Sequence, residues 1–194
     1  MITTKKLREC NACEGQVELF EKVFPEGCEP TNENIQTALD AGLNIGWAQI
    51  AGLVKLNGMF KYPDGYVAYY KDGLLHRDGE PAIMCADGAV EYWKNGQRHR
   101  DDGPAIVWAD GRVEYYKNGQ LHRDDGPAVV WADGRVEYWK NNRLHRDNGP
   151  AIVCADGSMS YFKNGQLHRD DGPAVVWADG SIEYWKNGQR QLDK

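Results

Sequence analysis

The spacing of apolar residues changes near residue 55. Before this point apolar residues recur every three or four positions, as in Val17, Phe20 and Val23, which is the spacing of a buried helical face. After it, short apolar runs rich in β-branched residues are separated by pairs that contain glycine, which is typical of short strands joined by tight turns. The sequence therefore predicts a helical module over residues 1–55 and a β region over residues 56–194.

Three helices are predicted in the first region from their capping residues. Asn11, followed three positions later by Glu14, matches a capping box, so we expect the first helix to start there. Thr31 is expected to cap a second helix that ends near Gly42, and Asn44 is expected to cap a third.

The second region repeats with a period of 23 residues. An Asp-Gly pair marks each repeat, without insertion, at Asp64-Gly65, Asp87-Gly88, Asp110-Gly111, Asp133-Gly134, Asp156-Gly157 and Asp179-Gly180. A tyrosine and a lysine follow each pair in constant register, and a second turn pair, usually Asn-Gly, follows the lysine. Residues 56–194 are therefore predicted to form six β-hairpin repeats.

The repeat at residues 103–125 shows how each unit is expected to fold. A two-residue type I′ turn at Asp110-Gly111 would join strands 104–109 and 112–117. This register pairs Trp108 with Val113 and Ile106 with Tyr115, and it places these four side chains on one face, predicted to be the core. Residues of mixed polarity lie on the opposite face: Val107, Arg112, Glu114 and Tyr116. We expect that face to meet solvent or a partner.

A single repeat cannot bury enough apolar surface to fold alone. Its few buried side chains contribute roughly 2 kcal/mol each, whereas ordering the chain costs on the order of 1–2 kcal/mol per residue. Neighbouring repeats must cover one another, and the ends of the array need caps. The predicted fold is therefore mainly β: an elongated antiparallel β-hairpin repeat array with a small N-terminal α-helical cap domain.

Composition and charge narrow the functional classes. The formal net charge is −6, whereas binding to nucleic acid or to an anionic membrane by charge needs a basic surface. The sequence has no apolar stretch long enough to span a membrane, and its N-terminus lacks the apolar segment of a signal peptide. The five cysteines are irregularly placed, which favours free thiols in a reducing compartment. We therefore expect a cytoplasmic protein that binds neither membrane nor nucleic acid directly.

The repeats resemble the MORN repeat family. Residues 133–141 and 163–168 carry the shared features: the Asp-Gly turn, a Tyr-Trp strand, a Lys-Asn-Gly turn and a following histidine. The chain departs from the family pattern because Tyr138 and Trp139 are adjacent, without an intervening glycine, and because residues 145–150 form a longer segment. The repeats of this chain, which centre on the sequence HRDDGPA, resemble variant repeats of bacteriophage and other viral proteins. Its helical start resembles a module found ahead of repeat arrays in phage proteins.

This resemblance implies a function in binding. MORN proteins act as scaffolds, and the phage-like features imply an accessory protein that binds and inhibits a host protein, such as a component of a defence system, in the host cytoplasm. No enzymatic activity, catalytic residue, cofactor or metal is predicted.

The five histidines share one repeat position: His76, His99, His122, His145 and His168. A catalytic histidine is normally a single residue, and successive repeats stand about 10 Å apart, too far to share a metal. Each histidine is therefore expected to bond a neighbouring carboxylate or backbone group. The residues that follow, such as Arg123 and Asp124, are expected to form an ion-pair ladder between repeats.

The cysteines offer no complete metal site. Cys10, Cys13 and Cys28 have the spacing of half a zinc site, but no fourth ligand is present in the helical module. Whether they bind a metal is left open. Cys85 and Cys154 stand at a repeat position that is aromatic elsewhere, and they are expected to be core substitutions.

An aromatic column provides the candidate partner-binding residues: Tyr70, Trp93, Tyr116, Trp139, Phe162 and Trp185. In the predicted register this column lies on the mixed face. It either packs against leucines across the second turn, such as Leu121 and Leu144, or provides anchors for a protein partner, since tryptophan and tyrosine dominate interface hot spots.

Three alternatives to a host-binding scaffold are left open. The acidic surface suits a nucleic-acid mimic that competes for a nucleic-acid-binding complex, although residues 103–125 carry only one net negative charge. The strand edge at residues 181–186 suits self-association into a homodimer. Glu9, Glu14 and Asp40 could form an enzymatic site, but no sequence feature orients them.

Overall fold

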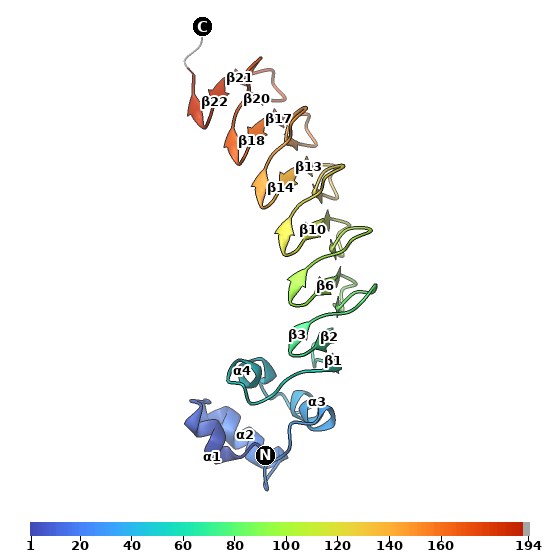
Figure 1. The fold of residues 1–194 in the computed structure, drawn as a ribbon, viewed down its shortest axis with the longest axis vertical. Coiled ribbons are helices and arrows are strands. Elements are labelled where there is room, and N and C mark those ends of the chain that lie inside the picture. Colours follow the sequence, from blue (N-terminus) through green and yellow to red (C-terminus); the bar gives the residue numbers. More distant parts are fainter. Residues whose placement is uncertain (192–194) are drawn as a thin grey trace. The chain divides into compact units, whose positions relative to one another are not determined.

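The chain folds into two compact units in a computed structural model that describes residues 1–191. Residues 1–87 form the first unit, and the second begins at Gly88 (Figure 1). Residues 192–194, the end of the predicted repeat array, lie outside the described residues. Short antiparallel strands follow a small helical N-terminus, so the prediction of a mainly β hairpin-repeat fold is confirmed. The predicted domain boundary at residue 55 stays a prediction.

The N-terminal part of the first unit consists of helices α1 (Thr4–Glu9), α2 (Glu14–Val23), α3 (Asn32–Asp40) and α4 (Ile45–Ile50). Two of the predicted caps are confirmed. The Thr31 hydroxyl accepts a hydrogen bond from the Asn34 N–H at 3.2 Å, and the Asn44 side chain accepts one from the Trp47 N–H at 2.9 Å.

The capping box at Asn11 and Glu14 was a wrong prediction. Asn11 has a φ of 60° in the turn after α1, and α2 begins after Cys13 without a side-chain cap. Glu14 instead forms an ion pair with Arg8 of α1 at 2.5 Å. Helix α1 has no apolar periodicity because Leu7 is its one buried residue, so the sequence pattern did not predict it.

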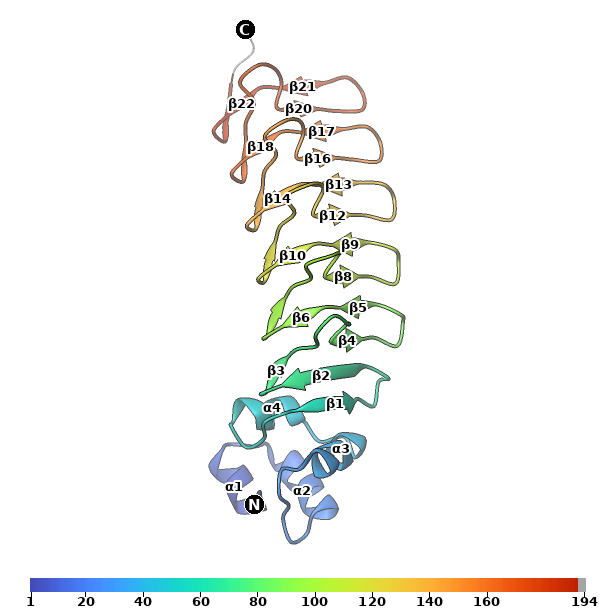
Figure 2. The same ribbon diagram turned by 45° about the vertical axis from the view of Figure 1, so that its right-hand side comes forward.

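Strands β1 (Gly58–Lys61), β2 (Val67–Lys71), β3 (Leu74–Leu75) and β4 (Ile83–Met84) complete the first unit. Phe60 of β1 is 1% exposed and pairs with the fully buried Ala68 of β2. Helix α3 lies beside β1 (Figure 2), and the Gln36 amide bonds both backbone groups of Lys61, at 2.7 Å from its carbonyl oxygen and 3.0 Å from its nitrogen. A side-chain amide thus replaces a neighbouring strand at this edge.

The second unit is built from strands of two residues. One ladder runs in the order β5 (Val90–Glu91), β8 (Ile106–Val107), β9 (Val113–Glu114), β12 (Val129–Val130), β13 (Val136–Glu137), β16 (Ile152–Val153), β17 (Met159–Ser160), β20 (Val175–Val176) and β21 (Ile182–Glu183). Figure 2 shows these strands as successive rungs.

A second hairpin follows each rung pair. These hairpins are β6 (Trp93–Lys94) with β7 (Gln97–Arg98), β10 (Tyr116–Lys117) with β11 (Gln120–Leu121), β14 (Trp139–Lys140) with β15 (Arg143–Leu144), β18 (Phe162–Lys163) with β19 (Gln166–Leu167), and β22 (Trp185–Lys186) with β23 (Gln189–Arg190). Their turns are the predicted type: Asn118 and Gly119 both have positive φ, 51° and 76°.

The Asp-Gly turn differs from the predicted two-residue type I′ turn. Gly111 has a φ of 90°, but Asp110 does not have positive φ. The Trp108 N–H donates to the Arg112 carbonyl at 2.9 Å, so residues 109–111 form a three-residue loop. The Asp110 carboxylate closes this loop by accepting the Arg112 N–H at 2.9 Å.

The extra loop residue changes which side chains share a face. Val107 pairs with Val113, and Ile106 pairs with Glu114, whereas the prediction paired Ile106 with Tyr115. A shift of one residue moves every side chain of the returning strand to the other face. The predicted core face is therefore wrong: Glu114, 9% exposed, lies with the buried Ile106.

Adjacent repeats meet at fully buried alanines. Ala105, Ala128, Ala151 and Ala174 in the second unit are each 0% exposed. The backbone bonds the repeats at the same place, since Tyr115 N–H donates to the Ala128 carbonyl at 2.7 Å and Tyr138 N–H donates to the Ala151 carbonyl at 2.7 Å. The recurring Pro-Ala pair thus marks the contact between repeats.

Candidate functional site: grooves between repeats

Three surface grooves of the same build recur in the second unit. They are lined by residues 99–103, 115–117 and 122–125, by residues 123–126, 138–140 and 145–148, and by residues 146–149, 161–163 and 168–171. Their volumes are about 580, 390 and 540 Å³. Each of these inter-repeat grooves lies between two successive His-Arg-Asp loops, with a tyrosine, an aromatic residue and a lysine between them.

An arginine stacked on tyrosine supports each loop. The Arg123 guanidinium lies 4.0 Å from the centre of the Tyr115 ring and donates to the Asp125 carboxylate at 3.0 Å and to the Pro127 carbonyl at 3.4 Å. Gly126 leaves room beside it, because a Cβ there would lie 3.0 Å from the guanidinium carbon and would push the arginine aside. The predicted ion-pair ladder between repeats is wrong for Arg123, since its carboxylate partner lies in its own loop. The recurring Arg-x-x-Gly spacing was the sequence signal for this stack.

The histidines link one repeat to the next. His145 Nδ1 accepts the Asn164 N–H at 3.1 Å, and Nε2 lies 3.1 Å from the Asp147 carboxylate. Because Nδ1 accepts, Nε2 must carry the proton that binds Asp147. His99 and His168 repeat this arrangement toward the turns that follow them. The last repeat has Gln191 at this position and no following turn within the described residues.

Replacing His145 with leucine should loosen one junction between repeats. The Asn164 N–H would lose its acceptor at a site where the histidine side chain is 11% exposed, which costs about 1–2 kcal/mol. Hydrogen exchange should therefore be faster at the Asn164 amide, while the Asn187 amide, which donates to His168, serves as the internal control. Unchanged exchange at Asn164 would contradict this linking role.

The aromatic column is half-buried and bonded within its own repeat. Its polar atoms bind a glutamate two residues earlier: Trp93 with Glu91 at 2.9 Å, Tyr116 with Glu114 at 2.9 Å, Trp139 with Glu137 at 2.8 Å and Trp185 with Glu183 at 2.8 Å. Phe162 has no polar atom, and Ser160 stands in place of its glutamate. Ala68 stands at the glutamate position two residues before Tyr70, and the Tyr70 hydroxyl bonds the Tyr62 hydroxyl at 3.1 Å instead.

Hairpin pairing places the aromatic column opposite the second strand of each hairpin. Tyr116 pairs with Leu121 and Trp139 pairs with Leu144, as the packing interpretation predicts. Tyr116, Trp139 and Phe162 also line the three grooves. Burial and the bond to Glu114 raise the pKa of Tyr116. The use of this column by a partner stays a prediction.

Charged residues of both signs surround the grooves. Aspartates at the rims are well exposed, with side-chain exposures of 84% for Asp102 and 83% for Asp125. Asp170 is bonded by Lys186 at 2.9 Å and by His168, and these two bonds lower the pKa of its carboxyl to about 2. The Asp170 carboxylate thus stays ionised at neutral pH.

A stack of tryptophan and arginine next to the Asp-Gly turns of the middle repeats was not predicted. The Arg112 guanidinium lies 4.4 Å from the Trp108 ring and 4.6 Å from the Trp131 ring. Two repeats after Trp108 the same position is Cys154. One repeat after Arg135 the same position is Ser158. The stack is therefore confined to the middle repeats, where the Glu114 carboxylate joins it to the aromatic column by accepting from Trp108 at 3.1 Å and from Tyr116 at 2.9 Å.

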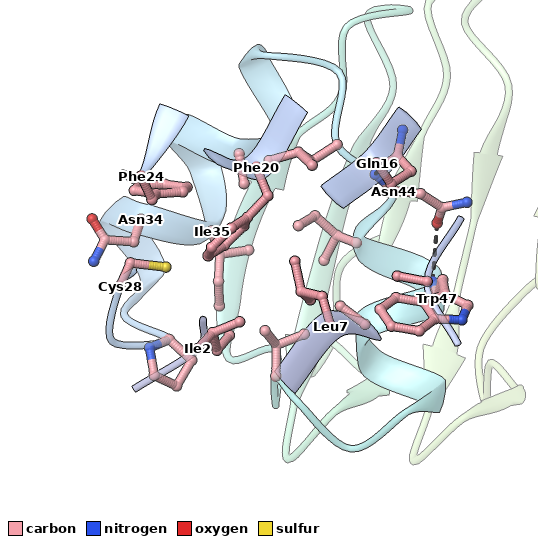
Figure 3. Close-up of a pocket in the computed structure, with 17 residues that line it drawn as sticks. Ile2, Leu7, Gln16, Phe20, Phe24, Cys28, Asn34, Ile35, Asn44 and Trp47 are labelled. Carbon is pink, nitrogen blue, oxygen red and sulfur yellow. Dashed lines mark hydrogen bonds between the residues drawn. The ribbon is translucent and has the colours of Figure 1, made fainter. Parts of the chain in front are cut away.

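The helical part of the first unit encloses an apolar cavity of about 50 Å³ (Figure 3). Its lining includes Leu7, Phe20, Ile35 and Trp47, and Cys28 lies at its margin. Burial raises the pKa of the Cys28 thiol. A cavity of this size would hold only a few water molecules, and most of its wall is apolar, so we assign no ligand to it.

The remaining chemistry-bearing residues of the helical part are not assembled into a reaction centre. Glu9 lies 4.0 Å from Lys5, Glu14 is paired with Arg8, and Asp40 accepts a bond from the Gln36 amide. Cys10, Cys13 and Cys28 are free thiols. Within residues 1–191, histidine, cysteine and acidic side chains form no group of three able to hold a metal ion.

No protein-family model matches the chain, and no curated protein matches it. Among the helices of residues 1–191, none has the length and apolar character needed to cross a membrane.

Proposed function

We propose that this chain is a non-enzymatic scaffold that binds a protein partner along its inter-repeat grooves. The recurrence of three grooves of one build, each a repeat apart, is the observation that supports this most strongly. A row of equivalent subsites suits a partner that is itself a regular chain. The similarity of the repeats to phage proteins extends the proposal: the partner is a host protein, and binding inhibits it.

The spacing of the grooves suits an extended polypeptide. Each repeat adds two strands, so neighbouring grooves stand about 10 Å apart. An extended segment in the polyproline II conformation rises about 3.1 Å per residue and turns once every three residues, so every third side chain of such a partner would lie on one side and reach the next groove. Main-chain groups of such a segment could bond the exposed loops without any requirement for a particular sequence.

The charge of the grooves favours a protein over a nucleic-acid competitor. The groove at residues 123–148 is lined by Arg123, Lys140 and Arg146 and by three aspartates, Asp124, Asp125 and Asp147. A mimic of nucleic acid needs carboxylates without interleaved cations. Exposed rim aspartates next to aromatic side chains instead suit lysine or arginine side chains of a partner protein.

Charge reversal at the groove rims tests the proposal. The full chain and the double variant Asp102→Lys, Asp125→Lys would each be used to capture proteins from a bacterial lysate, with Glu18→Lys, Glu21→Lys as the control. The control changes the same charge at exposed positions of α2. We expect the parent chain and the control to retain one stoichiometric protein and the groove variant to lose it, by at least about tenfold in affinity.

Two results would reject the proposal. One is the absence of any stoichiometric protein from the parent chain's capture, and the other is equal capture by the groove variant. Circular dichroism of both variants checks that the fold is kept, which is needed because Asp102 and Asp125 each accept a bond at 3.0 Å from the arginine of their own loop.

A further inference from the structure

The last repeat leaves apolar side chains exposed that earlier repeats cover. Trp177 is 49% exposed, Ile182 45% and Tyr184 37%. The equivalent residues of the preceding repeat, Cys154, Met159 and Tyr161, are partly buried. Large apolar side chains gathered on a sheet edge mark a surface that another strand can cover.

The backbone of β21 is open at the same place. In the preceding repeat, β17 pairs with β20, with Met159 opposite Val176, and the Tyr161 N–H donates to the Ala174 carbonyl at 2.7 Å. By equivalence, the outward groups of β21 are those of Ile182 and the N–H of Tyr184. Within the part of the chain that the structure describes, these groups bond no other strand.

Strand β1, which begins the hairpins of the first unit, does not offer a matching edge. The Gln36 amide occupies both outward groups of Lys61, and the Asn32 amide bonds the Asn57 carbonyl at 2.6 Å. Because side chains of helix α3 bond this edge of β1, β1 cannot pair with β21 of a second molecule. Of the two end strands of the long sheet, β1 and β21, a second copy of the chain therefore offers its own β21.

We propose that two copies of this chain associate through antiparallel pairing of β21 with β21, about a two-fold axis at Ile182. In this register each Ile182 bonds the other through its N–H and carbonyl, and the two exposed isoleucine side chains lie opposite each other. Each Tyr184 N–H reaches the Gly180 carbonyl of the second copy. The same patch meets itself, so the assembly closes at two molecules.

Other registers of the same two strands are less favourable. An axis at Glu183 would place two carboxylates directly opposite each other, which destabilises a strand pair. It would also need the Tyr184 carbonyl, which already accepts the Gln191 N–H at 2.8 Å. Pairing about Ile182 instead places Glu183 opposite Ser181 of the second copy, so no two like charges face each other.

This inference goes beyond the proposed function and does not depend on it. The grooves lie along the repeats, whereas the dimer uses the outer edge of β21. Loss of host-protein capture by the groove variant would leave the dimer unchanged, and loss of the dimer would leave the three grooves intact.

Solution mass measured over a wide concentration range tests the dimer. Light scattering coupled to gel filtration should give a species of twice 21.9 kDa that dissociates on dilution. Ile182→Lys should give the monomer at every concentration, because two ammonium groups would meet on the axis. Ile50→Lys is the matched control, since Ile50 is 89% exposed and belongs to α4 of the first unit, and it should dimerise like the parent.

A cross-link tests the register independently. Ile182→Cys should form a disulfide-linked dimer under mild oxidation, whereas the parent chain, with its five cysteines, should not form it at the same rate. A strictly monomeric parent chain, a dimer that survives Ile182→Lys, or an open-ended series of larger species would each overturn the proposal. An Ile182→Cys chain that dimerises but cross-links no faster than the parent would also overturn it.

Discussion

Alanine in place of Phe60 should lower the free energy of unfolding of the first unit by about 3–5 kcal/mol. Phe60 is 1% exposed and joins the hairpin β1–β2 to the helices, because it belongs to one buried cluster with residues of α2, α3 and α4. Its ring lies 6.1 Å from the ring of Tyr70. Removing the ring leaves a cavity that strands and helices cannot fill together.

Denaturation followed by far-ultraviolet circular dichroism measures this loss, because helices α1–α4 all lie in the first unit. Met59→Ala is the matched control on the neighbouring residue of β1. Met59 is 47% exposed, so its replacement should change the free energy of unfolding by less than about 0.5 kcal/mol. Equal effects of the two substitutions would show that β1 does not join the helical core.

Alanine in place of Glu137 should cost the second unit about 2–4 kcal/mol. The Glu137 side chain is 9% exposed, bonds Trp139 Nε1 at 2.8 Å and pairs with Arg135 at 2.6 Å. The substitution leaves the half-buried Trp139 indole N–H without its acceptor, whereas Arg135, whose side chain is 39% exposed, can bond water instead. Denaturant unfolding of the variant would give the loss directly.

The sequence of the next repeat suggests a variant that should restore the stability lost in Glu137→Ala. One repeat later, Ser158, Ser160 and Phe162 stand in place of Arg135, Glu137 and Trp139. The triple variant Arg135→Ser, Glu137→Ser, Trp139→Phe removes the donors together with the acceptor, and it should recover much of the stability that Glu137→Ala loses. A triple variant less stable than Glu137→Ala would show that the buried bonds are not the cause.

Glu183→Ala completes the comparison. Glu183 makes the same bond to a tryptophan, Trp185, but its side chain is 26% exposed in the last repeat. Water can reach the donor when the carboxylate is removed, so the cost should be clearly smaller than at Glu137. The difference measures what burial by a following repeat adds to one hydrogen bond.

The repeats could be predicted from the sequence because every repeat forms the same turns and packs in the same way, so equivalent residues recur. The 23-residue period, the type I′ turn at Asn118-Gly119 and the caps at Thr31 and Asn44 follow from backbone preferences that single residues carry. The column of histidines was correctly expected to bond neighbouring carboxylates and backbone, since recurrence at one position argues against a reaction centre.

Tertiary structure alone decided which faces the side chains occupy and which side chains line the grooves. A three-residue loop at 109–111 replaced the expected two-residue turn, and this single residue moved Glu114 into the buried side of the repeat. The pairing of glutamate with tryptophan, the stacking of Arg123 on Tyr115 and the closure of the β1 edge by Gln36 join residues whose contacts depend on register and on neighbouring repeats. Spacing along the chain fixes local turns, but contact across repeats depends on a register that the pattern of apolar residues does not determine.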